Sequence, residues 1–250
     1  MNKPYLATAL EAAARATQII EESVGAALEI RTKSSPRDLV TQVDHASERA
    51  VREVIWRDHP EHSILGEEEG LTGTGPYRWV VDPVDGTSNF ARGVPHFAVS
   101  IGLEHEGDGY LGVITNPTLG NTYHALRGQG AFKNGDRLRV SGCAALGAAF
   151  VTVSFSAEEG AVSQAKPVWD ALLTRCQTLR RMGSTALELA LLAEGKTDAF
   201  IGFGQGVWDY AAGSLLVEEA GGRVKCLADG TTILAASSGV LLRKLEVLLA

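Results

Sequence analysis

The sequence predicts an α/β (α+β) fold made of two closely packed subdomains, residues 1–140 and 141–250. The first observation is size, because 250 residues, 45% hydrophobic and 21% charged, suffice for a large buried core. The second is a run of short strands and glycine turns between Phe97 and Val140, typical of an antiparallel meander. The third is the alternation of strands and helices after about residue 145, typical of an α/β unit.

Composition excludes several classes of protein. Lys and Arg total 23 against 30 for Asp and Glu, a net charge of −7, so bulk charge does not favour nucleic acid or anionic membrane. Cys143, Cys176 and Cys226 lack a CxxC spacing and provide neither a disulfide framework nor a cysteine zinc site. The six histidines form no HExxH pair, which also disfavours zinc. Glu11 and Arg15 interrupt the apolar N-terminal stretch, so we expect a cytoplasmic protein without membrane or nucleic-acid partners.

Two helices and a strand are predicted in the first 85 residues. Apolar side chains recurring every three or four residues predict an amphipathic helix over about residues 6–28: Leu6, Leu10, Ala13, Thr17, Ile20, Val24 and Leu28. A Ser/Pro-bearing loop follows and ends at Thr41, the predicted N-cap of a helix that runs toward His59 and Pro60. A strand at 78–81 ends abruptly at Asp82-Pro83.

The rest of the chain is predicted as a meander followed by alternating elements. Strands are expected within residues 96–105, 109–117 and 121–128, and Asn134-Gly135 predicts a hairpin turn. Six further elements alternate: strands at 150–153, 177–181 and 198–201, and helices at 164–175, 185–193 and 210–220. We assign no element beyond residue 220.

Acidic residues recur where predicted elements begin or end. They are Glu67 after a short apolar run, Asp82 and Asp85 after the 78–81 strand, and Asp209 at the start of a helix. If these four carboxylates converge, each pair about 4 Å apart repels by about 4 kcal/mol at an effective dielectric of about 20. Hard divalent cations remove that penalty, and an all-oxygen ligand set selects Mg²⁺ or Mn²⁺ over zinc.

The segment DPVDGT, residues 82–87, adds an anion site to these acids. Asp82 and Asp85 lie three residues apart, and Gly86 lets the backbone approach a ligand closely. Gly86, Thr87 and Ser88 are expected to open a short helix whose free N–H groups accept an anion. Metals beside such a helix start predict in-line attack of a metal-activated water on a phosphomonoester.

With these motifs the chain resembles the inositol monophosphatase family of Mg²⁺-dependent, lithium-sensitive phosphatases. The matching segments cover nearly the whole length: KSSP from Lys33, DLVT from Asp38, GEE from Gly66, WVVDPVDGTSNF from Trp79, WDYAAG from Trp208 and EAGG from Glu219. The resemblance implies a layered α-β-α-β-α sandwich of the sugar phosphatase type. In it, an antiparallel N-terminal sheet is followed by a mixed C-terminal sheet. It also implies a homodimer and two to three Mg²⁺ ions per site.

The resemblance further implies a role for each metal-site residue. Glu67, Asp82 and the Val84 carbonyl would hold a first metal, and Asp82, Asp85 and Asp209 a second. A third, weaker metal would depend on Glu67 through waters.

Other residues of the family site bind water and substrate. Glu67 and Thr87 would orient and deprotonate the attacking water, with Asp44 supporting Thr87. Lys33 matches a mobile residue that helps close the metal site. The substrate-binding set implied by the resemblance is Asp85, Gly86, Thr87, Gly183, Ser184, Thr185 and Asp209.

Three of these residues also have a purely structural interpretation. Asp44 lies three residues after Thr41, as the acid of a capping box would. Thr185 and Glu188 form another Thr-x-x-Glu box, and for Thr185 helix capping is favoured over substrate contact. Asp209 alone would be a helix-capping acid, but DPVDGT in the same chain favours its metal role.

The preferred substrate is less well determined by the sequence than the chemistry. Gly202 stands seven positions before Asp209, where inositol-preferring members of the family commonly have an acidic residue that binds ring hydroxyls. Inositol monophosphate or a similar polyol or sugar phosphate therefore competes with fructose-1,6-bisphosphate, histidinol phosphate and 3′-phosphoadenosine nucleotides. Arg180 and Arg181 could meet a second phosphate. A non-catalytic regulatory or binding protein on the same scaffold is the alternative from another class.

Overall fold

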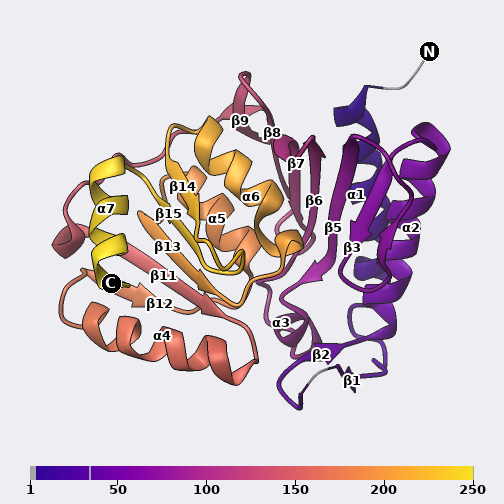
Figure 1. The fold of residues 1–250 in the computed structure, drawn as a ribbon. Helices are drawn as coiled ribbons and strands as arrows, with labels where there is room; N and C mark the ends of the chain where they lie inside the picture. The colour runs from indigo at the N-terminus through magenta and orange to yellow at the C-terminus, as the bar shows by residue number, and fades with distance from the viewer. Residues whose placement is uncertain (1–3, 34, 250) are drawn as a thin grey trace.

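The computed structural model describes residues 4–33 and 35–249, which form two sheets packed between three layers of helices (Figure 1). Helices α1 and α2 cover the outer face of the larger sheet. Helices α5 and α6 lie between the sheets, and α4 and α7 cover the far face of the smaller sheet (Figure 1). This α-β-α-β-α order confirms the predicted sandwich.

The helices have the following bounds: α1 Tyr5–Ser23, α2 Gln42–Asp58, α3 Thr87–Ala91, α4 Glu159–Leu172, α5 Thr185–Ala193, α6 Val207–Glu219 and α7 Gly239–Leu248, with a 3₁₀ turn at Leu146–Ala148. Within the described residues, no helix combines the length and hydropathy that crossing a lipid bilayer requires.

The larger sheet has the strand order β10-β9-β8-β7-β6-β5-β3-β4. Its strands are β3 Ser63–Gly66, β4 Gly70–Thr72, β5 Tyr77–Asp85, β6 Ala98–His105, β7 Asp108–Asn116, β8 Asn121–Leu126, β9 Gly130–Lys133 and β10 Asp136–Arg137. The turn between β9 and β10 is the predicted hairpin, with positive φ at Asn134 and Gly135. The prediction of an antiparallel sheet is wrong at one pair: β3 and β5 run parallel, because β4 returns the chain along the outer side of β3.

The smaller sheet has the order β12-β11-β13-β15-β14, with parallel pairs on one side of β13 and antiparallel pairs on the other. Its strands are β11 Phe150–Phe155, β12 Thr178–Arg180, β13 Ala199–Phe203, β14 Arg223–Cys226 and β15 Ile233–Ala236. The predicted mixed sheet is therefore confirmed. A two-stranded ribbon, β1 Arg31–Thr32 and β2 Leu39–Val40, precedes α2.

Each interface between layers contains its own apolar cluster. One lies under α1 and α2 and includes Ile20, Trp79 and Ile101. A second lies between the sheets around α5 and α6, and a third lies under α4 and α7. The division into subdomains at residue 140 stays a prediction.

Some predicted boundaries differ from the structure. Helix α1 ends at Ser23, not near residue 28, because Val24 is extended and Gly25 adopts φ +80°. Helix α4 begins at Glu159, five residues earlier than predicted, and continues through Pro167. No element was predicted after residue 220, yet β14, β15 and α7 complete the smaller sheet and its cover, and α7 buries Leu241 and Leu245 on one face.

Candidate active site

The end of strand β5 supplies two carboxylates to the interior of the molecule. The pairing of β5 with β6 shifts register between Asp82 and Asp85, so the strand bulges at Pro83 and Val84. Both side chains are almost wholly buried, at 2% and 7% exposure. The chain then turns at Gly86, where φ is +95° and a Cβ would lie only 2.9 Å from the Gly183 carbonyl oxygen. The sharp turn places the start of α3 next to both acids.

The third carboxylate comes from the first turn of α6. Asp209 Oδ2 accepts a hydrogen bond from the Gly206 amide at 2.8 Å, so Asp209 caps its helix as well as facing β5. One oxygen each from Asp82, Asp85 and Asp209 can be chosen so that all three lie within 4.8 Å of one another. Asp82 and Asp209, which lie 127 positions apart (82 to 209), thus converge with Asp85 as predicted. Glu67, the fourth acid of the prediction, is not part of this group of three, but its charge contributes to the raised pKa of Asp82.

This crowding shifts the acids away from their ordinary titration range. Burial, followed by the charges of Glu67, Asp85 and Asp209, raises the pKa of Asp82 well above its usual value. Burial raises the pKa of Asp85 to about 7, although hydrogen bonds from Ser184 and Ala186 oppose the shift. Burial and the charges of Asp85 and Glu67 likewise raise the pKa of Asp209. Such a donor set, made only of oxygens, fits a hard divalent cation.

Asp44 connects the second helix to the start of α3. Its Oδ2 accepts hydrogen bonds from the Thr41 amide (2.9 Å) and the Thr41 hydroxyl (2.6 Å), which completes the capping box of α2. Its Oδ1 lies 2.9 Å from the Thr87 hydroxyl, which is also 3.1 Å from the Val84 carbonyl oxygen. Both interpretations offered for Asp44 therefore hold in the structure: it caps a helix and it holds Thr87.

Lys33 reaches the acidic segment after β3. Its Nζ donates to Glu67 Oε1 at 2.7 Å and to Glu68 Oε1 at 2.5 Å. Burial raises the pKa of Glu68 to about 7, whereas the ammonium of Lys33 opposes that shift. Burial lowers the pKa of Lys33, but the two carboxylates raise it by more. The predicted loop residue thus lies beside the predicted metal ligand Glu67; its neighbour Ser34 in the KSSP motif lies outside the described residues.

Asp85 also connects β5 to helix α5. Its Oδ2 accepts from the Ser184 hydroxyl (2.5 Å) and the Ala186 amide (2.7 Å), and its Oδ1 accepts from the Thr185 amide (3.2 Å). The cap of α5 is Ser184, one residue before the Thr185 predicted from the Thr-x-x-Glu spacing. The Thr185 hydroxyl instead contacts the buried side chain of Gln205.

A cleft of about 770 Å³ opens beside these groups. Its walls include five of the predicted site residues: Glu67, Gly86, Thr87, Gly183 and Asp209. Ser184 and Thr185 are buried behind this wall and do not line it. Their placement does not support the predicted contact with substrate hydroxyls, because both hydroxyls are engaged inside the protein.

Two buried residues that position the site were missed from the sequence. Glu48, in α2, accepts from the backbone amides of Glu68 (2.7 Å) and Glu69 (3.1 Å) and pairs with Arg52 at 2.8 Å. Arg52 in turn donates to the Gly70 carbonyl at 2.7 Å. The pair therefore fixes the segment that carries Glu67. The i,i+4 spacing of a glutamate and an arginine within a predicted helix is the sequence signal that could have identified this pair.

A third missed role belongs to Glu188, which was considered only as a capping acid. It is fully buried, and its Oε1 accepts from the amides of Met182 (3.2 Å) and Gly183 (3.0 Å) and from the Ser154 hydroxyl (3.2 Å). Glu188 thereby holds the loop before α5 against the cleft.

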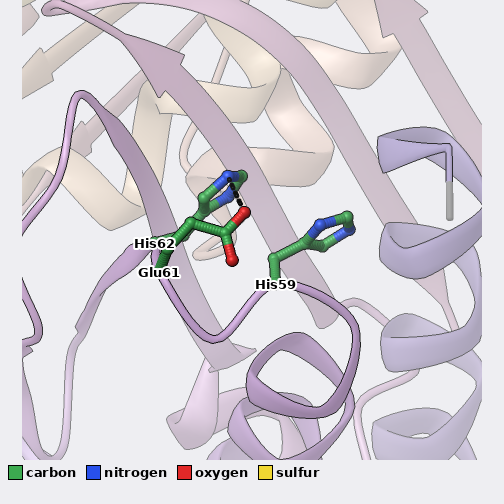
Figure 2. A group of neighbouring side chains, drawn as sticks. All are labelled: His59, Glu61 and His62. Atoms are coloured by element: carbon green, nitrogen blue, oxygen red, sulfur yellow. Dashed lines mark ion pairs between the residues drawn. The ribbon is translucent and has the colours of Figure 1, made fainter. Parts of the chain in front are cut away.

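A second group of side chains with metal-binding atoms, His59, Glu61 and His62, lies at the C-terminal end of α2 (Figure 2). The Trp79 indole donates to His62 Nδ1 at 3.1 Å, so the neutral ring carries its proton on Nε2. That nitrogen faces Glu61 Oε1 at 3.5 Å. Because the Trp79 hydrogen bond occupies the lone pair on Nδ1 and Nε2 carries the proton, the neutral His62 ring has no lone pair left for a metal. We assign this cluster a structural role.

Comparisons with known proteins agree with the site. The model of the inositol monophosphatase family matches residues 1–249. A protein of Pseudomonas aeruginosa called Nus factor SuhB is 39% identical over 231 residues, which cover 89% of this chain and 85% of that protein. Its namesake in Escherichia coli K12 is 40% identical over 233 residues, covering 91% of this chain and 86% of that protein.

Solved structures give the same assignment. The extragenic suppressor protein suhB of Bartonella henselae superposes with a TM-score of 0.91 and 33% identity, covering 98% of this chain and 97% of that one. An inositol monophosphatase from Anabaena gives a TM-score of 0.86 and 33% identity, covering 98% of this chain and 94% of that one. With the sequence motifs, the fold and the acidic site in agreement, the chain belongs to the inositol monophosphatase family.

Proposed function

We propose that this protein is a Mg²⁺-dependent phosphomonoesterase that hydrolyses inositol monophosphate or a similar small polyol or sugar phosphate. The observation that carries the proposal is the convergence of Asp82, Asp85 and Asp209 next to the Asp44–Thr87 pair, at one cleft. Titratable groups with strongly shifted pKa values in a cleft are typical of catalytic sites.

The oxygen donors fit two to three Mg²⁺ ions, with Mn²⁺ able to replace them. Glu67, Asp82 and the Val84 carbonyl would hold one ion, and Asp82, Asp85 and Asp209 another; a third would depend on Glu67. Such ions, when bound, activate water and neutralise charge on the entering and leaving oxygens of the phosphate.

The chain's own groups would orient water and substrate around that centre. The Thr87 hydroxyl, once it donates to Asp44, can accept a hydrogen bond from a water and hold it for attack. Glu67, which also lines the cleft, would take the water's proton. The Gly86 and Thr87 amides would bind the phosphate, and Gly183 lies on the same wall.

The test is phosphate release by the purified protein with Mg²⁺ and with EDTA. The panel is inositol 1-phosphate, fructose-1,6-bisphosphate, histidinol phosphate and 3′-phosphoadenosine 5′-phosphate. We expect Mg²⁺-dependent turnover of a polyol or sugar phosphate and inhibition by lithium. Absence of release from every member of the panel would refute the phosphatase assignment. Light scattering in the same buffer tests the homodimer, which we propose together with a cytoplasmic location.

A regulatory function is the second candidate, because relatives 39–40% identical are called Nus factors. Binding to a transcription complex would be independent of hydrolysis if it uses the outer surface. An Asp85→Asn variant that still co-purifies with transcription proteins from the host would support this role. The intact set of acids favours hydrolysis as the primary activity.

A further inference from the structure

Two arginines from opposite halves of the chain line the cleft. Arg37 belongs to the β1–β2 loop, and Arg181 follows β12. Arg37 Nη2 donates to the Ala157 carbonyl at 2.7 Å, and Arg181 Nη2 donates to the Phe155 carbonyl at 3.0 Å. Because these carbonyls are two residues apart, at most about 7 Å along the chain, both guanidinium groups are anchored to one short segment.

Neither guanidinium is held by a carboxylate at ion-pair distance in the described part of the chain. Within residues 4–33 and 35–249, neither Arg37 nor Arg181 forms an ion pair, whereas several other arginines do: Arg31, Arg52, Arg57, Arg78 and Arg127. The Arg181 guanidinium carbon lies 3.9 Å from the centre of the Phe155 ring, which holds the group in place. Burial lowers the pKa of Arg181; the carboxylate of Glu188 opposes this shift, and the nearby charge of Arg37 adds to it. Two neighbouring guanidinium groups on one cleft wall, neither of them in an ion pair, form a site for an anion.

The position that binds ring hydroxyls in inositol-preferring members of the family is closed here. A Cβ added to Gly202 would lie 2.8 Å from Gln205 Cγ and 2.9 Å from the Phe200 ring. An acidic side chain therefore has no space at this position, and specificity must come from other groups of the cleft.

From these contacts we infer that the preferred substrate carries a second phosphate group, which Arg37 and Arg181 bind while the scissile phosphate lies at the acidic centre. The two positive charges of the guanidinium groups match the two negative charges of a substrate phosphate better than the single charge of a substrate carboxylate. The cleft of about 770 Å³ has both the arginines and Asp209 on its walls, so one sugar bisphosphate can reach both ends. The inference rests on the proposed phosphatase function. The inference assigns the second phosphate to Arg181 and not to Arg180. The Arg180 guanidinium donates to the Leu179 carbonyl, and Arg180 does not line the cleft.

The experiment compares two matched substrate pairs with Mg²⁺: fructose-1,6-bisphosphate against fructose 1-phosphate, and 3-phosphoglycerate against glycerol 3-phosphate. We expect the second phosphate to raise kcat/KM by at least about 30-fold and the carboxylate to raise it far less. A charge-assisted hydrogen bond contributes about 1.5–3 kcal/mol, or about 10- to 100-fold. Arg37→Gln and Arg181→Gln should therefore each raise KM for the bisphosphate by about tenfold or more, in excess of any change with the monophosphate. Arg180→Gln is the matched control and should leave the preference in place.

Several outcomes would overturn the inference. Equal kcat/KM for the two fructose esters would refute it while leaving the phosphatase function intact. A carboxylate gain as large as the phosphate gain would refute the choice of phosphate. Loss of preference in Arg92→Gln, which alters another arginine on the cleft wall, but not in Arg37→Gln or Arg181→Gln would place the anion elsewhere. Absence of release from all four esters would refute the proposed function and the inference together.

Discussion

The carboxylate of Asp85 accepts a hydrogen bond from the Ser184 hydroxyl at 2.5 Å, although 99 residues separate the two along the chain. The same Oδ2 accepts from the Ala186 amide at 2.7 Å. The proposed metal ligand is thus also the acceptor that joins the end of β5 to the start of α5. Asp85 therefore contributes both to the proposed metal site and to the contact between β5 and α5.

Asp85→Asn is expected to lower kcat by about 10³-fold or more, because loss of a ligand charge removes several kcal/mol of stabilisation. The side-chain NH₂ of the asparagine is a donor and would face the Ser184 hydroxyl or the Ala186 amide, which are donors too. The free energy of unfolding should therefore fall by about 1–3 kcal/mol. Phosphate release and urea unfolding measure the two effects. Ser184→Ala is the control: it removes the hydrogen bond, keeps the ligand, and should lose far less activity. Turnover of Asp85→Asn at the parent rate would exclude Asp85 from the metal site.

Thr87→Val should lower kcat by about 10²- to 10⁴-fold, because the hydroxyl held by Asp44 is the group proposed to orient water. It should also lower the free energy of unfolding by about 1–3 kcal/mol, because it removes the hydroxyl that donates to the buried Asp44 carboxylate. Thr87→Ser keeps a hydroxyl at the same position and should retain most of the activity. Steady-state kinetics with Mg²⁺ distinguish the two variants. A Thr87→Val variant with the parent kcat would show that the hydroxyl does not orient the water.

Glu48→Ala should lower the free energy of unfolding by about 3–5 kcal/mol, because it leaves the buried guanidinium of Arg52 with only the more distant and partly exposed Glu69 at 3.5 Å. Activity should fall as well, since the Glu68 and Glu69 amides lose their acceptor and the segment carrying Glu67 loosens. The double variant Glu48→Met/Arg52→Met removes both charges and should recover part of the stability but not the activity. Urea unfolding curves provide the measurement, and a single variant as stable as the parent would contradict the role of the pair.

Low pH should destabilise the fold because it protonates His62. Burial lowers the pKa of His62 and the neighbouring His59 lowers it further, while Glu61 opposes both. The folded state therefore prefers the neutral ring, so the stabilisation present above the unfolded pKa of about 6.5 is lost as the pH falls, by at most about 1.4 kcal/mol per pH unit. His62→Gln keeps an acceptor for Trp79 but cannot take up a proton.

The check is the free energy of unfolding measured from pH 8 to pH 5 for the parent and for His62→Gln. The variant should show the shallower decline below pH 6.5. Parallel curves would show that His62 does not cause the acid response and would assign that response to partly buried histidines such as His96 or His124, whose pKa values burial also lowers.

The sequence by itself determined the element types, the family and the identity of the proposed metal ligands. Helix periods, glycine turns and the cap at Thr41 are local properties, so they can be predicted without knowing what packs against them. The DPVDGT and WDYAAG segments could likewise be recognised from spacing alone. The end of α1 was placed too late although Gly25 marks it, and β14, β15 and α7 were not assigned.

Only the tertiary structure decided which side chains meet. The carboxylates of Asp82 and Asp209 converge because β5 ends where α6 begins, and the Glu48–Arg52 pair matters because it is buried beneath the Glu67 segment. The positions of Ser184 and Arg37 also depend on the tertiary structure. Ser184 is buried behind the cleft wall, where it donates to Asp85, and Arg37 donates to the carbonyl of Ala157 in the other half of the chain. The physical reason is that burial and contact between distant segments depend on how the layers pack, and no short stretch of sequence encodes that packing.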